Sequence, residues 1–258
     1  MDYISLLSGK PVWIDGVGWM RSPKIKEICG EFDGGISYGK YATYLSILQL
    51  NKKTLSAYME KIGLGSLIES IKEQTIPLFR VLMLMNDIRA LLVETIRFFV
   101  IGDVSIEMEG EYPRRLKITY QDKQTGLIDE SNFDMVRHTL MTLNHLSAEV
   151  VERQKKQTKS KDGRTQKFFE RAAKYEQQNK KNKEVDKFDL GNIVSKLCVY
   201  GSSYNLLTIY ELTVFQLYDQ FIQMCTMKGN NISEKIYCTW GGDSFKLDNW
   251  LIPIQNNT

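Results

Sequence analysis

His138 and His145 are the residues whose type and spacing come nearest to a metal or acid–base site. They are the only two histidines of the chain and stand seven residues apart in a segment with helical periodicity. On an ideal helix, Asp134 and Glu149 fall on the same side, within about 60°. Positions i and i+7 are separated by about 10 Å along the axis, so one metal ion cannot bind both histidines without another element. We therefore predict a solvated polar helix face and no metal site.

The four cysteines form no pattern typical of a metal or redox site. They are far apart in the sequence and include no Cys-x-x-Cys pair; they are Cys29, Cys198, Cys225 and Cys238. Such spacing indicates free, mostly buried thiols in a reducing compartment. The glycine-rich stretch 30–39 lacks the context of a phosphate-binding loop. We expect no enzyme and no cofactor.

A basic segment divides the chain. Residues 151–187 contain 13 Lys and Arg against 6 Asp and Glu, whereas the 258-residue chain as a whole has a net charge of only +3. Apolar residues nearly vanish here, so the segment cannot form a core of its own. We interpret residues 149–187 as a solvated, partly helical linker. A basic arm for nucleic acid is the alternative, but the acidic residues dilute it and no fold signature accompanies it.

The N-terminal elements are a hairpin followed by helices. Residues 11–21 predict a hairpin around a two-residue Asp15-Gly16 turn, and Ser22-Pro23 predicts the start of a helix. Further helices are expected over 38–49, 54–62, 66–74 and 78–101, and after Ser131 through Leu146. Strands are expected over 104–108 and 116–120.

The apolar run 78–101 is long enough to suggest a membrane span. Arg80, Asp87 and Glu94 recur in it every seven residues. Each charge costs about 2.5–3.5 kcal/mol at mid-bilayer even on the most permissive scale, so we predict a single buried core helix and no membrane segment.

The segment Ser203–Phe221 carries two overlapping helix-start signals. Thr208 precedes Glu211 by three residues, and Thr213 precedes Gln216 by three, so each threonine predicts a reciprocal cap. An apolar face follows, and we expect the helix to end at a Lys228–Asn231 turn, with a last short helix reaching Trp240. A preceding helix is expected to end at Gly201. The aromatic residues of this segment are candidates either for a partner-binding surface or for the core of a small domain: Tyr204, Tyr210, Phe215, Tyr218 and Phe221.

These elements predict a mainly α (α+β) fold in three parts. Residues 1–148 form a mostly helical domain with hairpins, 149–187 the linker, and 188–258 a small helical domain.

Two stretches resemble a known family. Residues 7–17 (Leu-Ser-Gly-Lys-Pro-Val-Trp-Ile-Asp-Gly-Val), followed by Ser-Pro-Lys-Ile-Lys-Glu-Ile over 22–28, resemble the start of small tail-assembly proteins of bacteriophages of Gram-positive hosts. Residues 207–221 (Leu-Thr-Ile-Tyr-Glu-Leu-Thr-Val-Phe-Gln-Leu-Tyr-Asp-Gln-Phe) are similar to a segment of phage tail assembly chaperones. The resemblance covers roughly the first 30 and the last 70 residues, and no residue roles transfer with it.

The resemblance implies a non-enzymatic protein of the host cytoplasm that is absent from the finished virion. Such chaperones bind the tape measure protein, help it to recruit tail tube protein, and are often made in short and frameshift-extended forms. A structural tail or baseplate component is the first alternative, and a nucleic-acid-binding protein that uses the basic linker is the second. A homo-oligomer stays open, and no membrane partner is expected.

Overall fold

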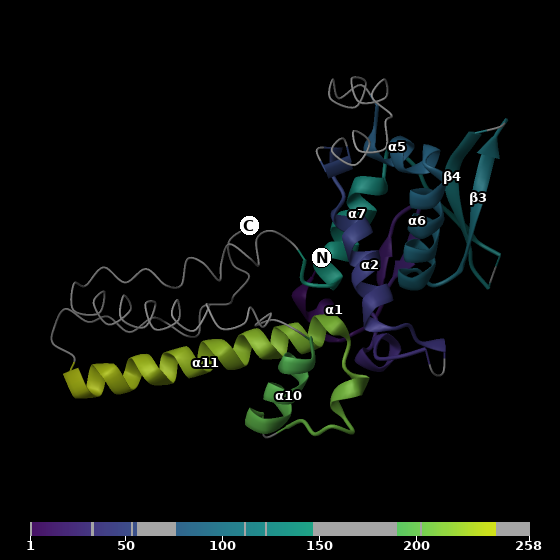
Figure 1. Ribbon diagram of the computed structural model, residues 1–258. Helices are drawn as coiled ribbons and strands as arrows, with labels where there is room; N and C mark the ends of the chain where they lie inside the picture. Colours follow the sequence, from purple (N-terminus) through teal and green to yellow (C-terminus); the bar gives the residue numbers. More distant parts are fainter. Residues whose placement is uncertain are drawn as a thin grey trace. The chain divides into compact units, whose positions relative to one another are not determined.

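A computed structural model describes residues 2–31, 34–52, 54–55, 76–110, 112–121, 123–146, 190–201 and 203–240. The predicted helices over 54–62 and 66–74 lie almost entirely outside these residues, and the linker over 149–187 lies entirely outside them. The chain divides into two units (Figure 1). The first comprises Met1–Ser147 together with Tyr210–Phe215, and the second comprises Ala148–Ile209 and Gln216–Thr258. Helices predominate beside two small antiparallel sheets, which confirms the predicted α+β class.

The predicted N-terminal hairpin is present in the first unit, after a short helix α1 (Tyr3–Leu7). Strands β1 (Val12–Ile14) and β2 (Gly18–Met20) pair with Trp13 opposite Trp19, whose rings meet edge to face at 5.2 Å. The turn has three residues and not the predicted two, because Ile14 pairs with Gly18. Val17, the additional turn residue, is buried. Burial of this apolar side chain therefore sets the length of the turn.

A three-stranded sheet follows the core helices. Strands β3 (Asp103–Glu109), β4 (Tyr112–Thr119) and β5 (Thr125–Ile128) are antiparallel in the order β3-β4-β5. The two predicted strands are confirmed, while β5 was missed because four residues including a glycine give little periodic signal. The backbone of β5 also meets the hairpin turn, since Leu127 N donates to Gly16 O (2.9 Å). The hairpin thereby covers one edge of this sheet.

The expected single helix over 78–101 is two helices, so that prediction was wrong. Helix α5 (Leu78–Leu84) ends before Met85, whose extended backbone (ψ 108°) separates it from α6 (Asn86–Phe99). Arg89 donates to Met83 O (3.0 Å) and to Asn86 Oδ1 (2.7 Å), which satisfies groups released at the break. Both helices have apolar buried sides, so the hydrophobic periodicity of the sequence continues through Met85 and gives no sign of the break.

Further helices of the first unit contribute to its core. They are η1 (Ile25–Ile28), a 3-10 turn, α2 (Tyr38–Gln49) and α7 (Phe133–Leu143). Helix α2 packs against both α6 and α7, and α5 and α6 contact the sheet. A buried hydrogen bond from Tyr41 Oη to Asn144 Oδ1 (2.8 Å) ties α2 to the end of α7.

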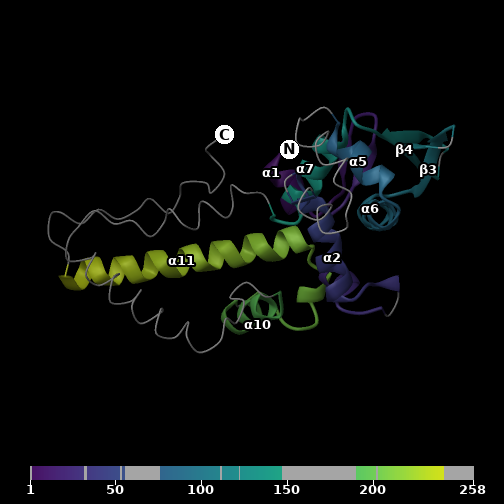
Figure 2. The same ribbon diagram turned by 45° about the horizontal axis from the view of Figure 1, so that its top comes forward.

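In the second unit, α10 (Leu190–Tyr200) lies beside α11 (Val214–Trp240), as Figure 1 and Figure 2 both show. Gly201 ends α10 as predicted, and its N–H donates to Leu197 O (2.8 Å). Helix α11 begins after Thr213 as predicted, but it continues for 27 residues through the expected turn at Lys228–Asn231. A glycine inside a helix costs only about 1 kcal/mol, so the Gly229-Asn-Asn run does not end this helix.

No helix in the described part of the chain is long and apolar enough to cross a bilayer.

Candidate docking sites

Tyr210–Phe215, here called the anchor segment, is held in the first unit by backbone hydrogen bonds. Ile25 N donates to Leu212 O (2.9 Å), and Val214 N donates to Pro23 O (2.8 Å). These bonds flank an antiparallel bridge between Lys24 and Thr213. The anchor segment is within the predicted C-terminal domain 188–258 but belongs to the first unit.

Ser22 caps α11 and not the helix that was predicted to follow it. Its Oγ accepts from Phe215 N (3.1 Å), the second residue of α11. The stretch after Pro23 forms only the 3-10 turn η1, which Glu27 closes by accepting from Lys24 N (2.7 Å). A capping side chain normally comes from the residue just before the helix. Here it comes from a residue 193 positions away.

Two lysines of the first unit hold Glu211. Lys24 Nζ lies 2.8 Å from Glu211 Oε2 and Lys26 Nζ 2.7 Å from Oε1. These hydrogen bonds lower the pKa of Glu211 to about 2. Glu211 therefore does not form the predicted capping box with Thr208. Asn205 takes the capping role there, and its Oδ1 accepts from the backbone N–H of Thr208 (3.0 Å).

The ring of Phe215 stacks on His145, with centroids 4.5 Å apart and 28° between the planes. His145 lies beyond the end of α7 with a positive φ of 53°, so the two histidines do not share one helix face as predicted. Burial lowers the pKa of His145 to about 4, although a backbone hydrogen bond at Phe215 opposes the shift. His138 is exposed on α7. The predicted solvated face thus holds for His138 and was wrong for His145.

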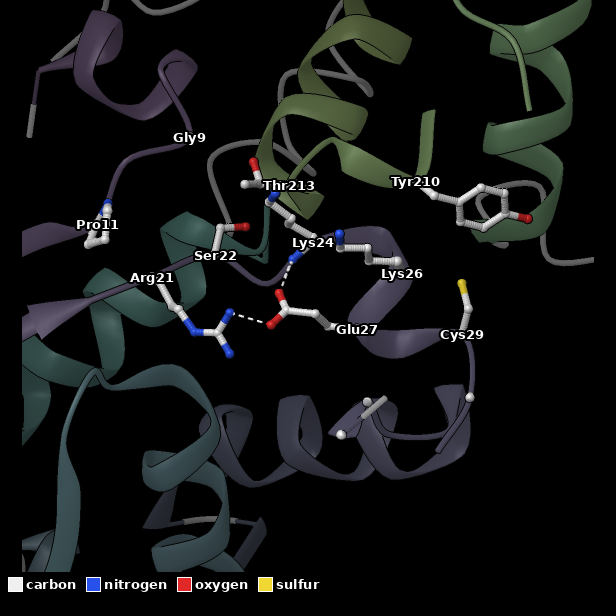
Figure 3. Close-up of a pocket in the computed structure, with 13 residues that line it drawn as sticks. Gly9, Pro11, Arg21, Ser22, Lys24, Lys26, Glu27, Cys29, Tyr210 and Thr213 are labelled. Atoms are coloured by element: carbon white, nitrogen blue, oxygen red, sulfur yellow. Dashed lines mark hydrogen bonds and ion pairs between the residues drawn. The ribbon is translucent and has the colours of Figure 1, made fainter. Parts of the chain in front are cut away.

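A cleft of about 810 Å³ borders the anchor segment in the first unit (Figure 3). Gly9 and Pro11 lie at one side of the cleft, and Cys29 and Tyr210 at the other. Arg21, Lys24, Lys26 and Glu27 also line it. Arg21 Nη1 lies 2.6 Å from Glu27 Oε1, and Arg21 has a second bond to the backbone. Every charged side chain of the lining thus already has a partner within the unit.

The cleft is lined by one cysteine, Cys29. Cys29 is a free, exposed thiol, and partial burial raises its pKa, so the nucleophilic thiolate is disfavoured. None of the four cysteines is fully buried, which corrects the expectation of mostly buried thiols. Among the described residues, no group of three or more His, Cys, Asp or Glu could hold a metal ion.

The second unit exposes several large apolar residues, here called the apolar surface. Val199 and Tyr200 end α10 with 73% and 64% exposure. Leu206 and Leu207 follow in the loop with 61% and 87%. Lys228 of α11 places its Nζ over the Tyr200 ring, 3.1 Å from the centroid. This cation–π contact connects the end of α10 with α11.

The five predicted partner-binding aromatics do not form one exposed surface. Phe215 (2% exposed) and Phe221 (6%) are buried. This agrees with the alternative interpretation, in which the aromatic residues belong to a core. Tyr204 and Tyr218 are half-buried in the second unit, and Tyr210 is half-buried and lines the cleft. The exposed residues Val199, Leu206 and Leu207 were not among the predicted site residues, although two adjacent leucines in a loop are a usable signal.

One comparison with known proteins gives a match. Residues 178–255 are similar to a family described as the YomV second domain. The match includes every described residue of the second unit and the anchor segment. Neither a curated protein nor a solved structure matches the chain. The apolar surface thus lies within the matched region, and the cleft is lined mostly by residues before it.

Proposed function

We propose that this chain is a non-enzymatic tail assembly chaperone that binds an amphipathic helix of a phage tape measure protein through the apolar surface. The single observation that carries a binding role is the exposure of Val199, Tyr200, Leu206 and Leu207 within nine residues of sequence. Large apolar side chains gathered on a surface mark sites of protein association, because their exposure to water is unfavourable.

The surroundings of the apolar surface support a helical occupant. An amphipathic helix presents apolar side chains at i, i+3, i+4 and i+7, and such a stripe is buried by contact with exposed leucine and aromatic side chains. Lys196 precedes Tyr200 by four residues on α10, and Lys228 of α11 contacts the Tyr200 ring. We therefore expect the bound helix to carry acidic residues beside its apolar stripe.

The choice of tape measure protein as the partner has a separate basis. It comes from the resemblance of residues 7–28 and 207–221 to tail-assembly proteins of phages, which implies recruitment of tail tube protein as well. The family similar to residues 178–255 carries a description that gives no activity. The binding role and the identity of the partner therefore need separate experiments.

Co-expression tests the partner. The full chain, with an affinity tag, is co-expressed with the products of its neighbouring genes, and the bound material is purified and tested for tape measure and tail tube proteins. We expect the tape measure protein to co-purify and to stay in solution only when the chain is present. Failure to recover either protein would sink the tail assembly role. Recovery of the chain from purified particles would favour the structural alternative.

A matched pair of variants tests the surface. Leu206→Ser combined with Leu207→Ser removes exposed apolar area without touching a core residue, so the fold should be unchanged. Ile4→Ser, at a residue of the first unit that is also highly exposed, is the control. We expect partner binding to fall roughly tenfold or more in the double variant only, because exposed anchors of an interface carry most of its affinity. Equal binding by both variants would remove the apolar surface from the proposal.

A further inference from the structure

Strand β3 ends the three-stranded sheet with an unpaired edge. It pairs with β4 on one side only, and no described strand lies on its other side. Figure 1 and Figure 2 draw it at the margin of the sheet. Helix α6 contacts the start of β3, where Arg97 Nη2 donates to Val104 O (2.9 Å). Beyond Val104, whose carbonyl is bound by Arg97, the outer edge of β3 has backbone N–H and C=O groups that another strand can pair with.

The side chains of β3 alternate strictly between two faces. Val104, Ile106 and Met108 share one face, and the four residues between and beyond them share the other. The irregularity in the β3–β4 register leaves this pattern intact, because the additional residue, Arg114, is on β4. Val104 is buried, while Ile106 and Met108 are exposed towards the end of the strand. An added strand would find apolar contacts on this face.

The other face of β3 is acidic. It carries Asp103, Glu107 and Glu109, whereas the neighbouring strand β4 presents Arg115 opposite Glu107 and Lys117 opposite Ser105. Arg115 Nε also lies 3.8 Å from Asp129 Oδ2, and Glu109 already forms an ion pair with Arg114 of β4. In the described part of the chain, neither Asp103 nor Glu107 forms an ion pair. Cross-strand pairs of opposite charge are stabilising, so this face favours a basic neighbour.

A second copy of the chain is a poor occupant of this edge. Antiparallel pairing of two β3 strands about Ile106 places Asp103 opposite Glu109 and Ser105 opposite Glu107. Like charges opposite each other across strands are destabilising. The acidic face therefore blocks self-association while it leaves the edge open to a strand of the opposite charge.

We propose that the free edge of β3 is a strand-addition site for an extended protein segment in which Lys or Arg alternates with apolar residues. The incoming strand places its apolar side chains beside Ile106 and Met108 and its basic side chains beside Asp103 and Glu107. Main-chain hydrogen bonds supply affinity and the alternation supplies specificity. This site is in the first unit and does not depend on the apolar surface or on the tail assembly role.

Peptide binding to the full-length chain tests the site. The probe is a fluorescent peptide (Lys-Val)₃-Lys, and its acidic counterpart is (Glu-Val)₃-Glu. A third peptide is the basic one N-methylated at its three central residues, which keeps every charge but removes donors from both edges of the strand. We expect saturable binding of the basic peptide, with shifts of the β3 amide resonances, and binding of the other two weaker by roughly tenfold or more.

Two charge-matched variants complete the test. Glu107→Lys should weaken binding of the basic peptide by roughly tenfold, because one favourable pair becomes a like-charge contact. Glu31→Lys makes the same change of net charge in an exposed turn outside the sheet and should leave binding unaltered. Circular dichroism checks that both variants fold. Absence of saturable binding overturns the proposal. Equal affinity for the N-methylated peptide also overturns it, because the interaction would then be electrostatic only.

Discussion

The stacked pair of His145 and Phe215 predicts a measurable pH dependence of stability. In the folded chain, burial lowers the pKa of His145 from 6.5 to about 4. When the chain unfolds, the imidazole returns to water and to its ordinary pKa. The unfolded state therefore takes up a proton first as the pH falls, and folding becomes less favourable below about pH 6.5. The loss levels off below about pH 4, where both states are protonated.

The size of the effect follows from the two pKa values of His145. One pKa unit corresponds to about 1.4 kcal/mol, so the full loss in free energy of unfolding is about 3 kcal/mol. Lowering the pH from about 7.5 to about 5 realises about 2 kcal/mol of it. That is a large share of the 5–15 kcal/mol typical of a domain.

The assay compares the chain with two histidine variants. Urea unfolding is followed by tryptophan fluorescence at both pH values for the wild type, His145→Phe and His138→Gln. His145→Phe keeps an aromatic ring on Phe215 but cannot titrate. His138→Gln removes the exposed histidine and serves as the control. We expect the wild type and His138→Gln to lose about 2 kcal/mol more than His145→Phe between the two pH values.

Two results would refute this reasoning. One is an equal loss of stability in the wild type and in His145→Phe. The other is a directly measured pKa above 6 for His145, from the pH dependence of its imidazole resonances in the folded chain. Either result would mean that water reaches the imidazole ring of His145 and that stacking on Phe215 does not exclude water from it.

Two further predictions concern the contacts that hold the first unit together. Ser22→Ala leaves Phe215 N without its capping acceptor, so we expect a loss of about 1–2 kcal/mol in urea unfolding, whereas Ser22→Thr should retain most of it. Gly126→Ala places a methyl group on the backbone carbonyl of Val17, and we expect a strongly lowered Tm or no folded protein. Gly39→Ala, in α2 with open space around it, should instead stabilise the chain by about 0.5–1 kcal/mol, and equal behaviour of the two glycine variants would contradict the close approach.

Local signals in the sequence were sufficient for much of the fold. The Asp15-Gly16 turn and the terminating Gly201 each mark an element boundary that the structure has. These signals succeed because capping and turn conformations depend on neighbouring residues. They fail where a distant contact decides, as at the turn residue Val17, whose burial lengthens the hairpin loop.

The candidate sites were harder to predict, for the same reason. Phe215 is apolar and on a helix, and nothing local distinguishes a core position from a binding position. His145 looked solvated because its helix was assumed to continue, whereas α7 ends two residues earlier. The free edge of β3 depends on the order of strands in the sheet, which a single sequence with short strands does not give. Strand order is set by non-local pairing.

The anchor segment also has a consequence for biosynthesis. Ribosomes add about 5–20 residues per second, so residues 210–215 are made roughly 10–40 s after Ser22. Throughout that interval the nascent first unit has Pro23 O and Ile25 N exposed to water, because their partners do not yet exist. In a product that stopped before Tyr210, these two backbone groups would stay exposed to water permanently. The first unit therefore reaches its finished form only when most of the chain has been synthesised, although nearly all of its residues come first.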